Sequence, residues 1–349
     1  MVDARGAKVH YTKRWNLEDL PSYVPEHKVS GVIRLWGSNY ITDGKLGGYW
    51  LEAFHRYQPD VSFSFHMTTS GVAITGLVTH LADIGVNHKI MWKELLVFQR
   101  EFKHDPVELT FAHGSLDVAG WAHAGLAIVN AKNPIDHLTL KQLDGIFGAE
   151  RTGGWLGTQW HREYARGPEG NIRTWGELGL TGEWRDKPIH VYMLNLKYDA
   201  ADDLCRWVLK GSDKWNEQMR LYANFSNPDG SFAFGEKLMI EDIGKDPYAI
   251  GYGPGMDDMV PAVKALALAA NEGEPYVSPT LESCRDGSYP FHEEVYFYLD
   301  RVPGQPMDAK TREFLRFILS REGQDAVQRD GKYLPLPAKV AREQLEKLQ

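Results

Sequence analysis

The chain has 349 residues, of which 43% are apolar and 25% are charged, and its formal net charge is −8. This length predicts about two domains with cores of their own, and the composition is ordinary for a globular protein. The acidic balance argues against a dedicated nucleic-acid-binding protein, which usually presents a basic face. It does not exclude an anionic ligand, because backbone amides can bind an anion locally in an acidic protein.

The first 30 residues have no clear hydrophobic period and are predicted to form an N-terminal arm. Residues 1–25 lack the apolar core of a signal peptide, and no run in the chain approaches the roughly 18 apolar residues that span a bilayer. Either the protein is cytoplasmic, or a leader preceded this sequence and was removed. Composition alone does not decide between the two.

Strands and helices alternate in the next part of the chain. Short apolar or alternating segments predict strands over 32–36, 61–66 and 83–86. Apolar residues recur at spacings of three and four in two segments, which predicts amphipathic helices over 45–57 and 72–81. Three strand–helix alternations in so short a stretch indicate an α/β architecture with a largely parallel sheet.

The rest of the chain continues in the same way. Further strands are predicted over 107–112, 121–130, 189–194, 249–253, 263–268 and 295–299. Further helices are predicted over 138–147, 199–210, 236–244, 308–319 and 320–329.

The stretch 149–186 differs from its surroundings because it is rich in glycine, arginine and tryptophan. We interpret it as a long ordered loop with short helices, inserted on the second domain. Its four tryptophans would either stack on a ligand or anchor the loop, and we favour anchoring: Trp155, Trp160, Trp175 and Trp184. The two cysteines, Cys205 and Cys284, lie far apart in the sequence, and we favour unpaired thiols over a disulfide.

A series of short motifs occurs in one order along the chain. They are Gly37-Ser38, Ser70-Gly71, Ala82-Asp83-Ile84-Gly85, the segments 125–134 and 138–147, Pro247-Tyr-Ala-Ile-Gly-Tyr252, Gly287-Ser-Tyr-Pro290, the segment 314–324, and Tyr333-Leu-Pro-Leu-Pro337. In this order, over roughly residues 31–337, the chain resembles the periplasmic phosphate-binding proteins, which are the substrate-binding components of phosphate-type ABC importers. Each motif alone is weak evidence, and the shared order carries the resemblance.

The resemblance implies a type II periplasmic-binding-protein fold, which is α/β with two lobes on a hinge, each lobe a mostly parallel sheet flanked by helices. Lobe one would comprise 31–115 and 290–349, and lobe two 116–289. The implied function is capture of a small oxyanion, phosphate first, and its delivery to a membrane ABC permease. The implied protein is a periplasmic or secreted monomer, its signal peptide removed, that uses no cofactor, binds no nucleic acid and is not an enzyme.

The resemblance also implies that two turns of lobe one face the ligand, at Gly37-Ser38 and at Thr68-Thr69-Ser70-Gly71. Turns that open helices suit an oxyanion, because unpaired backbone amides and the helix dipole coincide there. Serine and threonine in such turns also cap helices, a role worth about 1 kcal/mol each. The two roles are compatible, and we favour ligand binding.

Two departures from the family's pattern put phosphate in doubt. The family usually carries an aspartate shortly after the Asp-Ile-Gly strand, where this chain has Asn87, His88 and Lys89. It also usually carries an arginine and a Gly-Ser-Gly-Thr loop in lobe two, where this chain reads Met193-Leu-Asn-Leu-Lys-Tyr-Asp199 and Lys197 supplies at most a point charge. The predicted ligand-binding residues are Gly37, Ser38, Thr68, Thr69, Ser70, Gly71, Asn87, His88, His113 and Lys197.

Four histidines fall at or near predicted strand ends: His66, His88, His113 and His123. No His-x-x-x-His helix or cysteine pair accompanies them, so we predict polar or ligand-binding histidines and no metal site. Two rival functions remain. The first is a sensor or scaffold of the same fold that binds a different small ligand or none. The second, less well supported, is a phosphoester hydrolase, for which no Gly-x-Ser-x-Gly or P-loop motif is present.

Overall fold

The computed structural model describes residues 9–118, 122–255 and 259–349. These residues fall into two compact units. Unit 1 comprises 9–118, 122 and 293–349, and unit 2 comprises 123–255 and 259–292. Within the described ranges, no helix is both long enough and apolar enough to cross a membrane.

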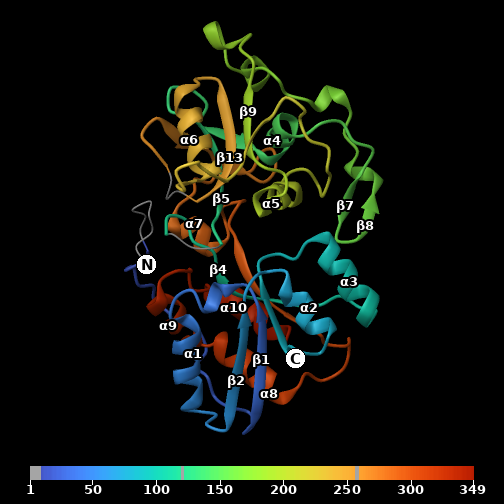
Figure 1. Ribbon diagram of the computed structural model, residues 1–349, viewed down its shortest axis with the longest axis vertical. Coiled ribbons are helices and arrows are strands. Elements are labelled where there is room, and N and C mark those ends of the chain that lie inside the picture. Colours follow the sequence, from blue (N-terminus) through green and yellow to red (C-terminus); the bar gives the residue numbers. More distant parts are fainter. Residues whose placement is uncertain (1–8, 119–121, 256–258) are drawn as a thin grey trace. The chain divides into compact units, whose positions relative to one another are not determined.

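Unit 1 is built on a five-stranded sheet in the order β2-β1-β3-β16-β4. Figure 1 labels β1, β2 and β4 of this sheet. Four of its strands run in one direction, and β16 runs against both of its neighbours. The strands are β1 (Gly31–Gly37), β2 (Val61–Met67), β3 (Ile84–Asn87), β4 (Val107–His113) and β16 (Glu294–Leu299). The helices are α1 (Leu46–His55), α2 (Val72–Val78), α3 (Trp92–Phe102), α8 (Ala309–Ile318), α9 (Arg321–Asp330) and α10 (Ala338–Glu346), with the 3-10 helix η1 (Asn39–Ile41) after β1.

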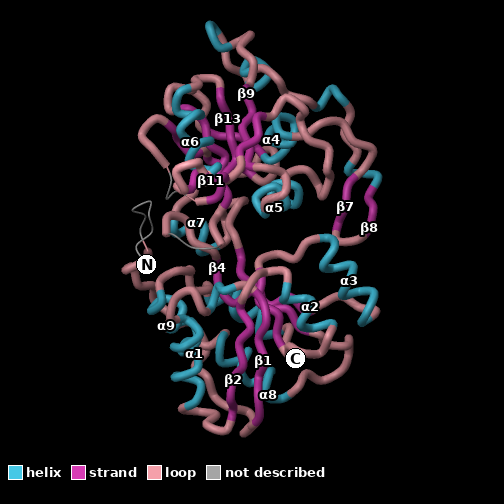
Figure 2. The backbone as a smooth tube through the Cα atoms, in the orientation of Figure 1, coloured by secondary structure: helices cyan, strands magenta, loops and turns pink. Residues whose placement is uncertain are grey.

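Helices cover both faces of this sheet (Figure 2), and alternation along the strands produces the two apolar layers. Val295 and Phe297 of β16 lie in the layer that contains residues of α1, α8 and α9. Tyr296 and Tyr298 point to the opposite face, where Phe98 of α3 completes a smaller layer with residues of α2. The central strands are therefore buried on both faces, whereas the edge strand β2 exposes Ser62, Ser64 and His66.

The N-terminal arm is part of the unit 1 core. Tyr23 is buried, and its hydroxyl donates to the Glu313 carboxylate at 2.7 Å. The same carboxylate accepts the backbone amides of Glu26 and His27, both at 3.1 Å, and pairs with Arg316 at 3.0 Å. Because Glu313 is fully buried, these donors compensate the cost of removing its charge from water.

Unit 2 is built on a second five-stranded sheet, in the order β10-β9-β13-β5-β14. Again one strand, β5, runs against its neighbours, and the other four share a direction. These strands are β5 (Gly125–Asn130), β9 (His190–Leu194), β10 (Arg220–Tyr222), β13 (Ala249–Pro254) and β14 (Val263–Ala265). Two-stranded sheets are formed by β6 (His137–Thr139) with β15 (Ala267–Ala269), β7 (Gly154–Leu156) with β8 (Gln159–His161), and β11 (Phe225–Ser226) with β12 (Phe232–Ala233). The helices are α4 (Leu140–Phe147), α5 (Asp199–Trp207), α6 (Gly235–Lys245) and α7 (Leu281–Asp286), with four 3-10 helices between 162 and 184.

Most predicted elements are confirmed, with two corrections. The prediction of a single strand over 263–268 is wrong. This segment contains two strands in different sheets, because β14 pairs with β5 whereas β15 pairs with β6. The strand predicted over 121–130 begins at Gly125, and Trp121 lies outside the described residues. Cys205 and Cys284 are not joined by a disulfide.

We expect replacement of Glu313 by alanine to destabilise unit 1 by about 3 kcal/mol, because the buried donors around it, including Arg316, lose their acceptor. Urea-induced unfolding followed by tryptophan fluorescence would measure the loss. Glu52→Ala is the matched control, since Glu52 pairs with Arg56 at the surface and its removal is expected to change stability by no more than about 0.5 kcal/mol. Equal losses in the two variants would contradict the role of the buried carboxylate.

Candidate functional site

The candidate site in unit 1 lies at the carboxyl ends of three adjacent parallel strands. The register of the sheet places Gly37 of β1 opposite Met67 of β2 and Val86 of β3. The turns that follow these strands therefore begin at one edge of the sheet, where ligands bind in open α/β sheets. The structure thus brings together eight of the ten predicted residues, which are Gly37, Ser38, Thr68, Thr69, Ser70, Gly71, Asn87 and His88.

The turn after β1 depends on Gly37. Its φ is 151°, and a Cβ atom there would lie 2.0 Å from the carbonyl oxygen of Val86. The next amide, that of Ser38, donates to the same oxygen at 2.9 Å, which fastens the turn to β3. The buried Ser38 side chain does not cap η1.

The turn before α2 does not use its hydroxyls for capping either. The helix begins after Gly71, whose backbone is already helical with φ −61° and ψ −13°. In the described part of the chain, the hydroxyls of Thr68, Thr69 and Ser70 make no hydrogen bond to an amide of α2, and both threonines are exposed. The capping role that the sequence allowed is therefore not used here.

The motif Ala82-Asp83-Ile84-Gly85 holds β3 in place behind this edge. Burial opposes ionisation of Asp83, but hydrogen bonds from Arg34 outweigh it and lower the pKa of the carboxyl. The Arg34 amide donates at 2.8 Å, and its guanidinium donates at 3.2 and 2.7 Å to the two carboxylate oxygens. The motif thus stabilises the pairing of β1 with β3.

Asn87 and His88 follow β3 and are held from several sides. The Asn87 side chain donates to the Ser70 carbonyl at 3.3 Å and accepts the His88 amide at 2.9 Å. The Nδ1 atom of His88 lies 3.0 Å from the hydroxyl of Tyr40 in η1. Sequence analysis missed Tyr40, and its only signal was its place two residues after Ser38.

The two remaining predicted residues do not belong to these three turns. His113 ends β4, which β16 separates from β3, and its backbone pairs with Leu334. Its Nε2 atom is 3.7 Å from Glu294, and the side chain is buried. Lys197 belongs to unit 2, where it is exposed in the turn between β9 and α5 and its amide donates to Asn195 at 3.0 Å. Among the described residues, no group of three or more His, Cys, Asp or Glu side chains is placed to hold a metal ion.

Unit 2 contains a cavity of about 570 Å³ that sequence analysis missed. Its lining mixes three carboxylates with one amine, an indole and apolar side chains, and includes Glu150, Leu196, Asp213, Lys214, Trp215 and Glu217. The carboxylates outnumber the amine, so the lining does not suit an anion. We assign this cavity no role.

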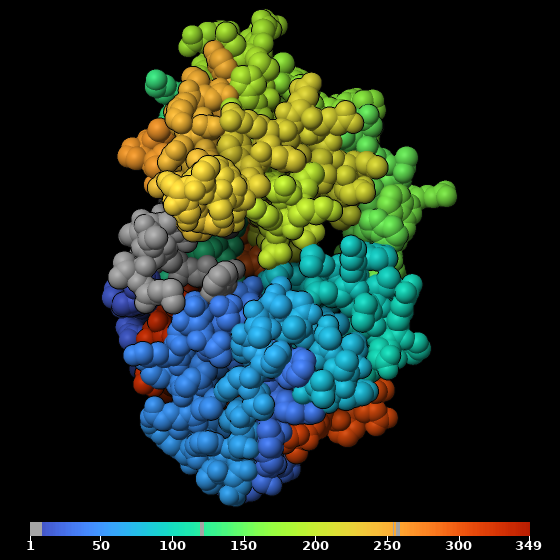
Figure 3. Space-filling model, viewed as in Figure 1, coloured from blue at the N-terminus to red at the C-terminus, as the bar shows by residue number. Residues whose placement is uncertain are grey.

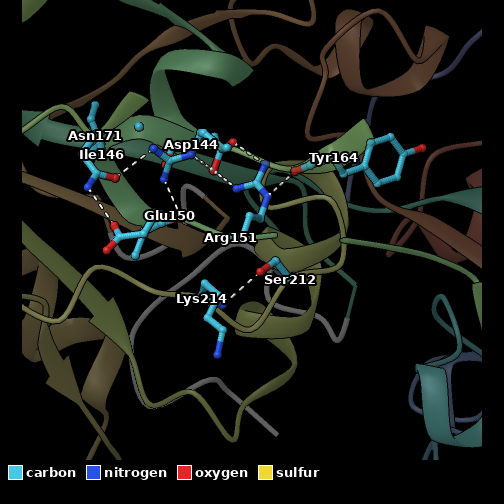
Figure 4. Close-up of polar contacts among 12 residues, drawn as sticks. Asp144, Ile146, Glu150, Arg151, Tyr164, Asn171, Ser212 and Lys214 are labelled. Carbon is cyan, nitrogen blue, oxygen red and sulfur yellow. Dashed lines mark hydrogen bonds and ion pairs between the residues drawn. The ribbon is translucent and has the colours of Figure 1, made fainter. Parts of the chain in front are cut away.

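The insertion 149–186 lies at the surface of unit 2 (Figure 3), and a buried charge cluster fixes it to the end of α4 (Figure 4). Both carboxylate oxygens of Asp144 accept from Arg151 at 2.6 Å. Arg166 lies 3.4 Å from the same carboxylate, and Arg173 donates to the carbonyls of Gly145 and Gly148 at 2.6 and 3.0 Å. Burial lowers the pKa of the Arg166 guanidinium, and the Asp144 charge partly offsets that effect.

The tryptophans of the insertion divide into two pairs. Trp175 is fully buried, donates to the Tyr248 carbonyl at 3.3 Å and meets Trp184 edge to face. Trp155 and Trp160 contact each other but are 37% and 46% exposed. Anchoring is therefore confirmed for Trp175, while Trp155 and Trp160 remain partly exposed.

Comparison with known proteins places the chain in a family. The profile described as "PBP superfamily domain" matches residues 46–322. The chain belongs to the PBP superfamily. This PBP superfamily member is 28% identical over 330 residues to the phosphate-binding protein PstS of Pseudomonas aeruginosa, covering 94% of the chain and 90% of the relative.

Two solved structures have the same fold as this PBP superfamily member. PstS from Borrelia burgdorferi has a TM-score of 0.56 and 14% identity, and the match covers 89% of the chain and 100% of that structure. An ABC-type phosphate transport receptor from Vibrio cholerae has a TM-score of 0.51 and 17% identity, with coverage of 87% and 100%. The comparisons confirm the resemblance and the predicted fold class.

Gly37 and Gly71 are expected to respond differently to alanine, although both lie in the predicted ligand turns. Gly37→Ala forces a Cβ atom onto the Val86 carbonyl and should cost about 1–3 kcal/mol. Gly71→Ala meets nothing within 4 Å and should change stability by no more than about 0.5 kcal/mol. Urea unfolding of both variants is the measurement, and tolerance of alanine at Gly37 would refute the close approach of β1 and β3.

Replacement of Asp144 by alanine is expected to destabilise unit 2 by about 3–5 kcal/mol, because it leaves Arg151 buried without a counter-charge. The insertion should also become sensitive to limited proteolysis. Asp213→Ala is the control, since the Asp213 side chain is 90% exposed. This substitution removes only an ion pair with Lys214, whose Nζ atom lies 3.7 Å from the carboxylate. If Asp144→Ala unfolds at the same urea concentration as wild type, the insertion is fixed by other contacts.

Proposed function

We propose that the protein captures a small oxyanion, with phosphate as the first candidate, and delivers it to an ABC permease. The observation that carries the proposal is the convergence of the turns at Gly37-Ser38, Thr68–Gly71 and Asn87-His88 on one edge of the unit 1 sheet. These turns carry backbone amides and hydroxyls, which are the donors that an oxyanion requires. The 28% identity with a protein named phosphate-binding supports the choice of phosphate.

The same proposal includes a role outside the cytoplasm, a monomeric state and no catalysis. The argument against catalysis concerns the hydroxyl groups of the site. The hydroxyls of Ser38, Thr68, Thr69 and Ser70 have no histidine partner among the described residues, so no activated nucleophile is formed there. His88 instead bonds to Tyr40.

The proposed set also includes Lys197 of unit 2, which stands between Leu196 and Tyr198 in the stretch where the family usually has a glycine-rich loop. A lysine ammonium is a point charge and cannot make the paired hydrogen bonds of a guanidinium. This composition also favours the second candidate, a sensor or scaffold of the same fold with another small ligand or none.

Isothermal titration with phosphate tests the proposal. Wild type should bind, and Ser38→Ala and Ser70→Ala should each weaken binding about two- to tenfold, the value of one hydrogen bond. Ser62→Ala is the control, because Ser62 is exposed near the opposite end of β2 and should leave the affinity unchanged.

Thermal unfolding against sulfate and small organic acids extends the test to other ligands. A ligand at a hundred times its Kd stabilises the folded state by about 2.7 kcal/mol. No shift with any compound, phosphate included, would reject the importer role and favour the sensor or scaffold.

A further inference from the structure

His88 has one hydrogen-bonding atom left over after its contacts within unit 1 are counted. Its amide donates to Asn87 and its carbonyl accepts from the Tyr298 hydroxyl at 3.1 Å. Its Nδ1 atom is occupied by Tyr40. Across residues 9–118, 122–255 and 259–349, no partner contacts Nε2. This nitrogen is therefore the atom through which His88 can meet a ligand at the sheet edge.

Tyr40 fixes the ring in either protonation state. It is 4% exposed and its ring meets that of Tyr333 edge to face at 6.1 Å, so the hydroxyl has a defined position. A phenol both donates and accepts hydrogen bonds. Tyr40 can donate to Nδ1 of a neutral His88, which leaves the proton on Nε2, or accept from Nδ1 of a protonated His88. In both states Nε2 can present an N–H group to an anion.

The acidic groups around His88 are already engaged. Glu94 of α3 accepts the Met91 amide at 2.9 Å and lies 3.4 Å from the Asn87 side chain. Glu108 of β4 forms an ion pair with Lys89.

The charged groups behind Tyr40 also have partners, although the Oδ2 atom of Asp330 has no hydrogen-bond partner among the described residues. Asp43 pairs with Lys332 at 2.6 Å, and Asp330 of α9 accepts the Lys45 amide at 2.6 Å. The strand β16 presents the hydroxyls of Tyr296 and Tyr298 and the carboxylate of Glu294, which accepts from the Tyr296 hydroxyl and lies 3.7 Å from His113. None of the described carboxylates forms an ion pair with His88, so a bound anion would supply its counter-charge.

We propose that protonation of His88 strengthens oxyanion binding, so that the affinity of the site rises as pH falls through the range in which histidine titrates. The proposal rests on the proposed function and adds its regulation. A hydrogen bond from a protonated ring to an anion is about twice as strong as one from a neutral donor. By linkage, the anion and the proton favour each other's binding by the same factor.

The test compares phosphate affinity of wild type and His88→Gln by calorimetry at about pH 5.5 and about pH 8, on either side of the ordinary histidine range. Phosphate itself changes protonation between these conditions, but that effect is common to both proteins. The affinity of wild type divided by that of His88→Gln at the same pH therefore reports the contribution of His88. This ratio should be about tenfold larger at the lower pH. His27→Gln, at an exposed position of the arm, should keep the wild-type profile.

The outcomes separate the two proposals. If wild type binds phosphate but the ratio is the same at both pH values, the role of His88 is overturned and the proposed function stands. If wild type binds no oxyanion at either pH, both fail. Should His88→Gln not fold, the ring of His88 is titrated by NMR in wild type. Its titration midpoint should move to higher pH on addition of phosphate, and an unmoved midpoint overturns the inference.

Discussion

The contact between Gly37 and the Val86 carbonyl is the constraint on which the unit 1 site depends. Only a residue without a Cβ atom allows β1 to end so close to β3, and the Ser38 amide then donates to the same carbonyl. This contact sets where η1 begins, and therefore where Tyr40 stands relative to His88. The alignment of the other two turns follows from parallel pairing, since one register serves all three strands.

Much of this arrangement was predictable from the sequence, because it follows from local periodicity. The alternation in β2 and the three–four spacing in α1 depend only on neighbouring residues. The split of 263–268 into β14 and β15 was not predictable, because it depends on partners more than a hundred residues away. Tyr40 was missed for the same reason, since its bond to His88 spans 48 positions.

The insertion shows how tertiary contacts decide between two uses of the same residue types. Arginines and tryptophans suit ligand recognition as well as anchoring. Here Arg151, Arg166 and Arg173 satisfy Asp144 and the last carbonyls of α4, where cations are favoured by the helix dipole. Two guanidinium groups, those of Arg151 and Arg166, share the Asp144 carboxylate, and Arg173 donates to backbone carbonyls instead. These three arginines bind Asp144 and backbone carbonyls within unit 2 and therefore stabilise the fold.

The electrostatics of the unit 1 sheet edge follow from the lack of a fixed cation among Gly37-Ser38, Thr68–Gly71 and Asn87-His88. Among the described residues of the three turns, backbone amides and hydroxyls supply the donors, and His88 carries the one imidazole. In a protein of net charge −8, neutral donors bind an anion against an unfavourable background. A site without a fixed cation in these turns therefore depends more strongly on a group that titrates. The ring held by Tyr40 occupies that position, with the nearby carboxylates already bound to other partners.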